Sequence, residues 1–342
     1  MSSLPTALPA VDITPLKGGA VLRWGVMAPG GIADSWVTTV HANTEQRVHA
    51  VASRSAERAA AFATKHGIAR AYGSYEQLAA DPDIDVIYIA SPHSEHLALA
   101  LLAIGAGKHV LVEKPIAVSA AEARQLAAAA RAAGVFAMEA MWSRFLPQTS
   151  IVAQLLADGA LGDIKQVTAS FGALFDYQPE SRWFNPALAG GALLDIGVYP
   201  LWFSQFVLGM PQTVTALGSL APTGVDAQSV VVLDYPSAAQ SIVTMTMWAE
   251  TSQTATVSGT RARIEYSGEF FAPSGFSLLS GDSRLDWTDP TGFSWGAGLC
   301  YQATAVAQAI ADGRTESPLH TLDDTIGVLE LIDSARAQLG AK

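Results

Sequence analysis

Residues 25–33 read GVMAPGGIA, and this stretch decides the fold that we expect. It follows an apolar β-branched run at 21–27 and precedes a run with helix-forming character. The register that fits a dinucleotide-binding turn is Ala28-x-Gly30-x-x-Ala33 against G-x-G-x-x-G/A, so the first glycine is replaced. Gly30 would let the backbone approach a pyrophosphate, and the helix N-terminus would supply amide hydrogens. A tight turn with no ligand would also explain the glycines, but the position of this stretch at the first strand-to-helix junction favours phosphate binding.

The second strand ends in Ser53-Arg54-Ser55, where an NAD-binding protein usually carries an acidic residue for the ribose 2′-hydroxyl. A hydroxyl and a guanidinium at this point would instead hold a 2′-phosphate, because arginine offers a planar fork of donors. The alternative is an arginine on a solvated helix start. The sequence therefore predicts NADP, with NAD as the less favoured cofactor.

Outward from this turn, short apolar runs alternate with longer Ala-rich runs, which is typical of βαβ units around a parallel sheet. Ser119 followed by Glu122 has the spacing of a capping box. The strands expected in this half are 21–27, 47–53, 86–90, 109–112 and 135–138; the helices follow Gly31 and cover 56–66, 95–106 and 119–133.

After a linking helix at 150–156, consecutive strands predict a largely antiparallel sheet. They are 167–177, 213–220, 229–235, 241–248, 255–258 and 262–266, followed by closing helices at 301–312 and 322–339. The fold class is α/β: a doubly wound parallel Rossmann sheet, then an α+β domain with a large, mostly antiparallel open sheet. We expect a flexible leader at 1–20, an NAD(P)-binding domain at 21–145 and a substrate-binding and dimerisation domain at 146–342, with the last helices packing on a sheet face or on the first domain.

Composition excludes several classes of function. The 20 basic and 31 acidic residues give a formal charge of −11, which argues against nucleic-acid and membrane partners, because both need clustered Lys and Arg. One cysteine, Cys300, excludes an intramolecular disulfide and fits a reducing cytoplasm; we interpret it as a small hydrophobic residue in a helix. No signal peptide and no uninterrupted apolar stretch of about 18 residues is evident. In 241–248 both strand faces carry apolar side chains, so we expect both to be partly covered and predict a homodimer through the second face.

Three further stretches are specific to one family. They are SPHSEH at 91–96, EKP at 113–115 and GGALLDIGVYP at 190–200. With the turn, they resemble the glucose-fructose oxidoreductase, inositol dehydrogenase and rhizopine-catabolism family of NAD(P)-dependent enzymes, from about Leu22 to the C-terminus. Tyr199 stands where many sugar dehydrogenases of this family carry histidine. The tyrosine, together with MEAMWSRF at 138–145, is similar to the branch with dimeric dihydrodiol dehydrogenase and NADP-dependent xylose dehydrogenase.

The resemblance implies a cis Lys114–Pro115 bond and a catalytic Lys114, which a lone lysine at a strand end would not indicate. From the residues themselves, Lys114 falls at the carboxyl end of a parallel strand, where ligands of open α/β sheets bind. Asp195 and Tyr199 are four apart, which on a helix places both on one face. Oxidising an alcohol requires removal of its hydroxyl proton, and Tyr199 could take it. The pKa of a free phenol, about 10, is high for a base at neutral pH, but a nearby cation such as Lys114 would favour the phenolate. Asp195 could orient a substrate hydroxyl or neutralise Lys114.

The remaining candidates have weaker signals. His93 and His96 are three apart, but no third ligand matches, so we predict no metal site; His96 is interpreted as structural and His320 as a surface residue. The predicted cofactor-binding residues are Ala28, Pro29, Gly30, Gly31, Ile32, Ser53, Arg54, Ser91, Pro92, His93, His96, Glu113 and Lys114. The predicted substrate-binding residues are Trp142, Arg144, Arg182, Trp183, Asp195 and Tyr199, although tryptophan and arginine also fill cores and interfaces.

The sequence thus predicts an oxidoreductase that passes hydride between NADP(H) and a CH–OH group of a sugar or cyclic vicinal diol. Two alternatives stay open. One is a redox-neutral glycoside-modifying enzyme that uses a tightly held nicotinamide transiently, and the other is a non-catalytic dinucleotide-binding sensor.

Overall fold

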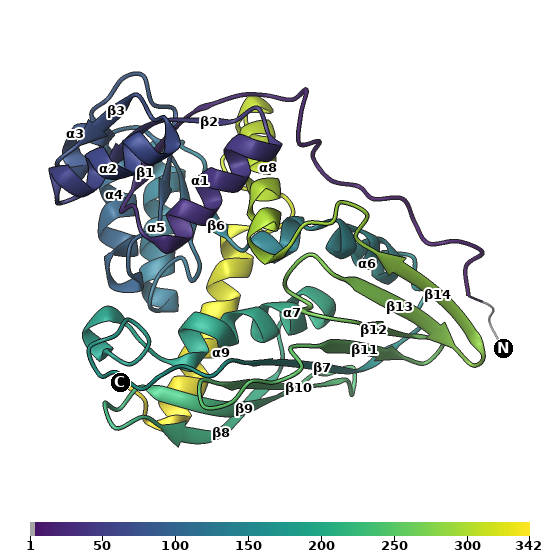
Figure 1. The fold of residues 1–342 in the computed structure, drawn as a ribbon. Helices are drawn as coiled ribbons and strands as arrows, with labels where there is room; N and C mark the ends of the chain where they lie inside the picture. Colours follow the sequence, from purple (N-terminus) through teal and green to yellow (C-terminus); the bar gives the residue numbers. More distant parts are fainter. Residues whose placement is uncertain (1–3) are drawn as a thin grey trace. The chain divides into compact units, whose positions relative to one another are not determined.

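The computed structural model describes residues 4–342, and these residues divide into two compact units. The unit that we call the Rossmann unit comprises Ile13–Phe145 and Ser294–Ile326. The unit that we call the sheet unit comprises residues 4–12, Leu146–Phe293 and Gly327–Lys342. Each unit has its own sheet (Figure 1).

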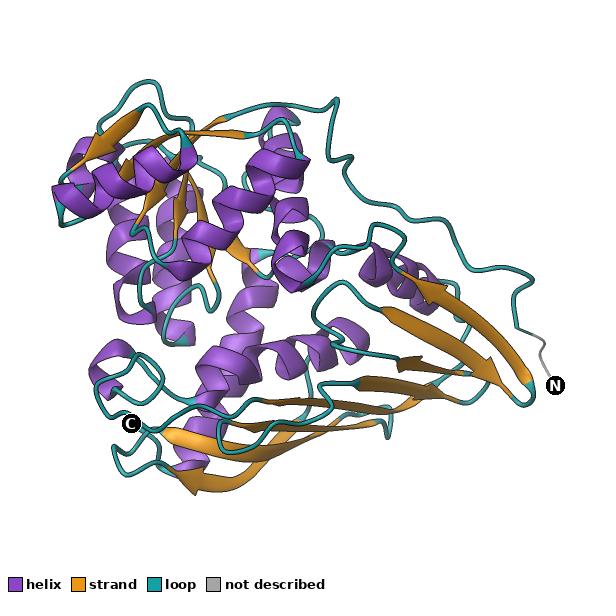
Figure 2. Cartoon of the chain, in the orientation of Figure 1, coloured by secondary structure: helices purple, strands orange, loops and turns teal. Residues whose placement is uncertain are grey.

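The Rossmann unit is built on a six-stranded parallel sheet of order β3-β2-β1-β4-β5-β6, the doubly wound order that the pattern predicts. Figure 2 shows helices around this sheet. Strands β1, β4 and β5 are almost wholly buried, as expected of central parallel strands. The strands are β1 (Arg23–Met27), β2 (Arg47–Ala52), β3 (Arg70–Tyr72), β4 (Val86–Ile89), β5 (His109–Glu113) and β6 (Ala137–Ala140).

Serine caps set the starts of three helices in this unit. Ser55, Ser74 and Ser119 accept hydrogen bonds from backbone amides three residues later, which satisfies groups that a helix leaves without partners. The helices are α1 (Gly31–Asn43), α2 (Ala56–His66), α3 (Tyr75–Ala79), α4 (His96–Gly105), α5 (Ala120–Ala133) and α8 (Cys300–Ala311). The last of these comes from the C-terminal part of the chain, and Thr39 Oγ1 of α1 donates to Ala297 O just before it, at 2.8 Å.

The sheet unit contains an eight-stranded sheet of order β14-β13-β12-β11-β7-β10-β9-β8. Every neighbouring pair is antiparallel except β7 and β10, so the prediction of a mostly antiparallel sheet is confirmed. The strands are β7 (Ile164–Gly172), β8 (Thr213–Leu220), β9 (Asp226–Asp234), β10 (Gln240–Thr246), β11 (Ala255–Gly259), β12 (Arg263–Tyr266), β13 (Gly275–Ser280) and β14 (Ser283–Thr288). Helices α6 (Pro147–Ala157) and α7 (Val198–Leu208) belong to this unit, and α9 (Leu322–Leu339) enters it at Gly327.

The two faces of this sheet differ in burial. On β10, Val243 and Met245 are fully buried on the face that α7 covers (Figure 1). On the other face Thr244 is exposed, and Ile242 and Thr246 are half-buried. The second face is thus less covered by the chain itself than the strand pattern suggests.

One segment, residues 186–208, is long and apolar enough by composition to cross a membrane. In the structure 83% of its most apolar window is buried inside the protein, as in a core helix of a folded domain. It is the segment that carries Asp195 and Tyr199.

Candidate functional site

In the turn after β1, Ala28 adopts the backbone conformation that glycine usually adopts at this position. Ala28 adopts a left-handed backbone with φ 64°, a region that side chains with a Cβ rarely occupy. Its amide donates to Ala52 O at 3.1 Å, and Gly30 N donates to Ala28 O at 2.8 Å, so the turn is fixed at both ends. The tight turn therefore forms without glycine at its first position.

Space beside this turn suits a pyrophosphate. Apart from its chain neighbours and the backbone of its own helix turn, the described residue nearest to a Cβ on Gly30 would be Ala28, with its O at 4.0 Å, and a Cβ on Gly31 would meet no described residue within 4 Å. The fold itself therefore does not require these glycines. Among the described residues, helix α1 also begins without a side-chain cap, and the buried Ser91 Oγ at the end of β4 has no hydrogen-bond partner. Open amides and an unpartnered hydroxyl at the carboxyl edge of the sheet fit a dinucleotide.

The segment that carries Lys114 is held by buried groups on both sides. The Lys114–Pro115 peptide bond is cis, as the family resemblance implies. Glu113 accepts hydrogen bonds from Tyr88 Oη and from Lys114 N, and burial raises the pKa of its carboxyl. The ring nitrogens of the fully buried His96 lie 2.8 Å from Pro115 O and 2.9 Å from Ser91 O, and burial lowers its pKa. His96 thus bridges the ends of β4 and β5.

A second buried carboxylate supports the same segment. Glu139 Oε1 accepts from Ile116 N at 3.0 Å, and Glu139 Oε2 lies 2.9 Å from His320 Nε2 and 3.1 Å from Thr325 Oγ1. His320 is only 3% exposed, so its interpretation as a surface residue is wrong. The sequence shows a histidine in a Ser- and Thr-rich loop and gives no sign of the carboxylate that buries it.

Arg54 lies at the end of β2, where a 2′-phosphate is expected. Its backbone is fixed, because Ser53 N donates to Tyr72 O at 3.1 Å and Ser55 Oγ caps α2. Its side chain is 72% exposed, and Arg54 Nη1 donates to Glu95 Oε1 at 2.9 Å. The guanidinium is accessible to a ligand but already has a carboxylate partner.

In the sheet unit, Asp195 and Tyr199 lie on one helical segment. A π-helical turn, Leu193–Gly197, leads directly into α7, and such wide turns occur often at functional sites. Asp195 is 5% exposed, and its Oδ1 accepts from Arg182 Nη1 at 3.0 Å. Three residues predicted to bind substrate are therefore brought together in this unit, because Arg182 lies against the segment that carries the other two.

Aromatic rings surround Tyr199. The ring centroids of Tyr199 and Phe271 are 4.9 Å apart, those of Tyr199 and Phe171 are 5.6 Å apart, and the two phenylalanines stack at 4.3 Å. Sequence analysis did not single out either phenylalanine, because one lies on β7 and the other after β12. Their proximity depends on tertiary structure.

Close contacts explain why the GGALLDIG motif has glycine at both of its first two positions. A Cβ on Gly190 would lie 2.6 Å from Trp183 O, and one on Gly191, which has φ +126°, would lie 2.4 Å from Asp226 Oδ1. Asp226, the first residue of β9, is 1% exposed, and its Oδ2 accepts from Leu193 N at 2.7 Å. Asp226 thus anchors the start of the segment that carries Asp195 and Tyr199.

Asp226→Asn should change how stability depends on pH. Burial raises the pKa of Asp226 from 3.8 to about 6, so the folded state holds its proton more tightly than the unfolded state. The resulting stabilisation is complete below pH 3.8 and is lost as the pH rises through about 6. Asparagine does not titrate, so the free energy of unfolding of Asp226→Asn relative to wild type should rise by about 2 kcal/mol between pH 4 and pH 7. Urea unfolding of both proteins at the two pH values measures this change, and an unchanged difference would contradict the assignment.

The other predicted residues lie in different surroundings. Trp142 is 1% exposed, with its ring centroid 5.7 Å from that of Trp295, and burial lowers the pKa of Arg144 to about 10. The Arg182 guanidinium lies 5.0 Å from the ring centroid of Trp183. Cys300 is fully buried at the start of α8, and burial raises the pKa of its thiol to about 12, in agreement with the interpretation as a small hydrophobic residue.

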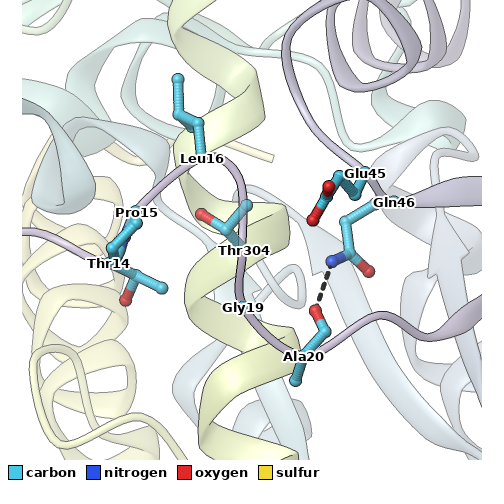
Figure 3. Close-up of a pocket in the computed structure, with 8 residues that line it drawn as sticks. All are labelled: Thr14, Pro15, Leu16, Gly19, Ala20, Glu45, Gln46 and Thr304. Atoms are coloured by element: carbon cyan, nitrogen blue, oxygen red, sulfur yellow. Dashed lines mark hydrogen bonds between the residues drawn. The ribbon is translucent and has the colours of Figure 1, made fainter.

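A small pocket lies at the opposite edge of the Rossmann sheet from the phosphate turn. It borders the start of β2, where Gln46 Nε2 donates to Ala20 O at 2.6 Å (Figure 3). The ligands of open α/β sheets bind at the carboxyl ends of the strands, so this pocket does not belong to the candidate site. Its lining comprises Thr14, Pro15, Leu16, Gly19, Ala20, Glu45, Gln46 and Thr304. Within residues 4–342, no group of three or more His, Cys, Asp or Glu side chains is arranged to hold a metal ion.

Comparison with known families explains this arrangement. A model described as an oxidoreductase family with an NAD-binding Rossmann fold matches residues 22–141, and the GFO/IDH/MocA C-terminal domain matches residues 150–265. The chain belongs to the GFO/IDH/MocA family of oxidoreductases. The predicted family, the fold class and the oxidoreductase activity with a nicotinamide cofactor are thereby confirmed.

Individual known proteins resemble the chain over almost its whole length. The trans-1,2-dihydrobenzene-1,2-diol dehydrogenase of Sus scrofa is 38% identical over 328 residues, which cover 93% of this chain and 97% of the relative. A 3-ketoreductase from Actinomadura kijaniata, solved with NADP and TDP-benzene, has a TM-score of 0.76 and 26% identity, and covers 93% of this chain and 97% of that one. Levoglucosan dehydrogenase in complex with NADH and levoglucosan has a TM-score of 0.84 at 21% identity, covering 94% and 97%, and thus shares the fold.

Proposed function

We propose that this GFO/IDH/MocA oxidoreductase transfers hydride between NADP(H) and a CH–OH group of a sugar or a cyclic vicinal diol. The observation that carries the proposal is the pairing of Asp195 and Tyr199 on one buried segment, in a chain 38% identical to a dihydrodiol dehydrogenase. Both groups can exchange hydrogen bonds with a hydroxyl, and neither suits a nucleophilic mechanism as well as proton transfer.

The chemistry follows from what alcohol oxidation requires. A bound nicotinamide supplies the hydride acceptor, or the hydride donor in the reverse direction. The Tyr199 phenolate accepts the proton of the substrate hydroxyl as the C–H bond breaks, and the resulting phenol returns it in the reverse reaction. The Lys114 ammonium stabilises the negative charge that develops on the substrate oxygen. Asp195 accepts a hydrogen bond from a second substrate hydroxyl, and Arg182 holds the Asp195 carboxylate in place.

The surroundings of Tyr199 favour a ring-shaped substrate. The half-buried ring of Phe171 lies beside the phenol with the buried Phe271 stacked against it, and Arg182 offers a polar fork beside the carboxylate. A cyclic diol or a sugar presents a C–H face to aromatic rings and adjacent hydroxyls to polar groups. Linear acids lack this combination.

The proposal of NADP over NAD rests on Ser53 and Arg54. A guanidinium that is exposed at the end of β2 offers a planar fork of donors that can bind two oxygens of a 2′-phosphate. Equal catalytic efficiency with both cofactors would count against this preference.

A cofactor-reduction screen tests the proposed function. The enzyme is mixed with aldoses, polyols, inositols and trans-dihydrodiols, with NADP and NAD in parallel, and absorbance of the reduced cofactor is followed. We expect lasting reduction with one class of CH–OH substrate. A reaction that converts substrate with no net change in absorbance would favour a redox-neutral glycoside-modifying enzyme, and cofactor binding with no turnover across the panel would favour a sensor.

We also propose that residues 146–342 serve substrate binding and dimerisation, and that the protein acts as a cytoplasmic homodimer. The second face of the sheet supports this, because Ile242 and Thr246 are only half-buried and Leu217 is 69% exposed. Light scattering at micromolar concentration should give twice the chain mass, and the mass of one chain would contradict the dimer.

A further inference from the structure

The carboxylate of Glu95 lies beside Arg54, in a stretch whose own residues include no acid. Rossmann proteins that bind NAD place an Asp or Glu at the end of the second strand, and here that position reads Ser53-Arg54-Ser55. Glu95 comes from a different segment, the last residue of the 3-10 turn His93–Glu95 after β4. Its Oε1 nevertheless lies 2.9 Å from Arg54 Nη1, so tertiary structure brings a carboxylate to the end of β2.

The two groups have opposite preferences for the adenosine ribose. A carboxylate accepts a hydrogen bond from the 2′-hydroxyl of NAD, whereas a guanidinium binds the 2′-phosphate of NADP. A bound 2′-phosphate must take Arg54 from Glu95 and then tolerate that carboxylate nearby, because like charges at close range repel. The Arg54 side chain is 72% exposed and that of Glu95 is 29% exposed, so their ion pair is weak enough to exchange partners.

A further basic residue, Arg58, lies near the pair of Arg54 and Glu95. Tyr75, 8% exposed, lies close enough to Arg54, Arg58 and Glu95 for all three charges to act on its phenol, whose pKa burial raises. Of these three charged groups, Glu95 is the one that disfavours a phosphate. Glu57 lies in the first turn of α2, and its carboxylate accepts a hydrogen bond from Ser55 Oγ at 2.8 Å.

We propose that Glu95 is a specificity-determining residue which, through its ion pair with Arg54, weakens the binding of NADP relative to NAD. The inference rests on the proposed binding of a nicotinamide dinucleotide along β1 and β2. It predicts that the preference of the chain for NADP over NAD is smaller than the sequence Ser53-Arg54-Ser55 alone indicates.

Glu95→Gln should tighten the binding of a 2′-phosphate without changing the binding of an unphosphorylated adenosine. Isothermal titration calorimetry of the full chain with adenosine 2′,5′-bisphosphate and with 5′-AMP measures this directly, without turnover. We expect the Kd for the bisphosphate to fall about tenfold, as expected when one repulsive charge beside the phosphate is removed. The Kd for 5′-AMP should change by less than about twofold, and the NADP-to-NAD ratio of kcat/KM should rise in parallel.

Glu57→Gln is the matched control, because it removes an equal charge from the first turn of α2, where the carboxylate is bound to Ser55 Oγ and not to Arg54. It should leave both Kd values nearly unchanged. An equal gain in Glu57→Gln would show a general effect of net charge and overturn the inference. In Arg54→Ala the bisphosphate should bind weakly. Adding Glu95→Gln to Arg54→Ala should lower the Kd for the bisphosphate by a smaller factor than Glu95→Gln does in the wild-type background, since the two side chains act as a pair.

The outcomes separate this inference from the proposed NADP preference. If wild type prefers NAD while Glu95→Gln still tightens the bisphosphate, the preference is wrong and the role of Glu95 stands. If Glu95→Gln leaves bisphosphate binding unchanged or weakens it, the role of Glu95 is wrong whichever cofactor wild type prefers. Failure of every form to bind the bisphosphate would overturn the placement of the ribose beside Arg54 and the inference with it.

Discussion

Lys114→Met should lower kcat by about 10²–10³-fold, a loss typical of removing one electrostatic stabiliser of the transition state. Methionine keeps the length and apolar stem of the side chain but cannot carry the positive charge that opposes charge on the substrate oxygen. The backbone around it should persist, because His96 and Glu139 hold the Pro115 carbonyl and the Ile116 amide. Stopped-flow and steady-state rates with the best substrate from the screen measure the effect.

Cofactor binding distinguishes a catalytic lysine from a structural one. The Kd for NADP in Lys114→Met, measured by quenching of tryptophan fluorescence, should stay within about threefold of wild type, because a charge that acts on the transition state adds little to ground-state binding. Lys165→Met is the control, since Lys165 is half-exposed and lies near Asp163 in the other unit. A wild-type rate in Lys114→Met, or a loss of NADP binding as large as the loss of rate, would contradict the assignment.

Local patterns predicted most of the Rossmann unit, because the residue pattern of each βαβ unit is contained within about thirty consecutive residues. Helix α2 occupies the expected range 56–66, and Ser119 caps α5 as its spacing with Glu122 indicates. Strand β3 was not predicted, because it has only three residues and one of them is charged. Strands β13 and β14 escaped for a different reason: their hairpin mixes Ser, Asp and Arg with apolar residues and gives no clear alternation.

The candidate site was predictable where its residues stand in motifs and unpredictable where they meet across the fold. Lys114, Asp195 and Tyr199 follow from their motifs. Their supporting partners do not, because the contact between Asp226 and Leu193 spans 33 residues and that between Glu139 and His320 spans 181. A single sequence records which residue types are present, but the pairing of buried charges depends on which strands become neighbours. The glycines at 190 and 191 were the one local sign that something packs tightly there.

Tyr199→Phe should lower kcat by about 10²–10⁴-fold, the range for loss of a general acid–base group. The substitution removes one oxygen and leaves the ring, which packs against Phe171 and Phe271, so the fold around α7 should be retained. KM should change by less than about threefold, and the primary isotope effect with substrate deuterated at the reacting carbon should increase, because the chemical step becomes slower than release of product.

Two further variants show whether the hydroxyl itself matters. Tyr235→Phe removes a buried hydroxyl in the same unit that has no hydrogen-bond partner within residues 4–342, and should leave kcat unchanged. Tyr199→His restores a group able to exchange a proton and should recover part of the rate lost in Tyr199→Phe. Because histidine titrates near pH 6.5, the recovered rate should fall below that pH in the direction of alcohol oxidation, which needs the unprotonated base. If Tyr199→Phe keeps the wild-type rate, or if Tyr199→His is as slow as Tyr199→Phe at every pH, the proton must pass through another group, and Asp195 would be the next candidate.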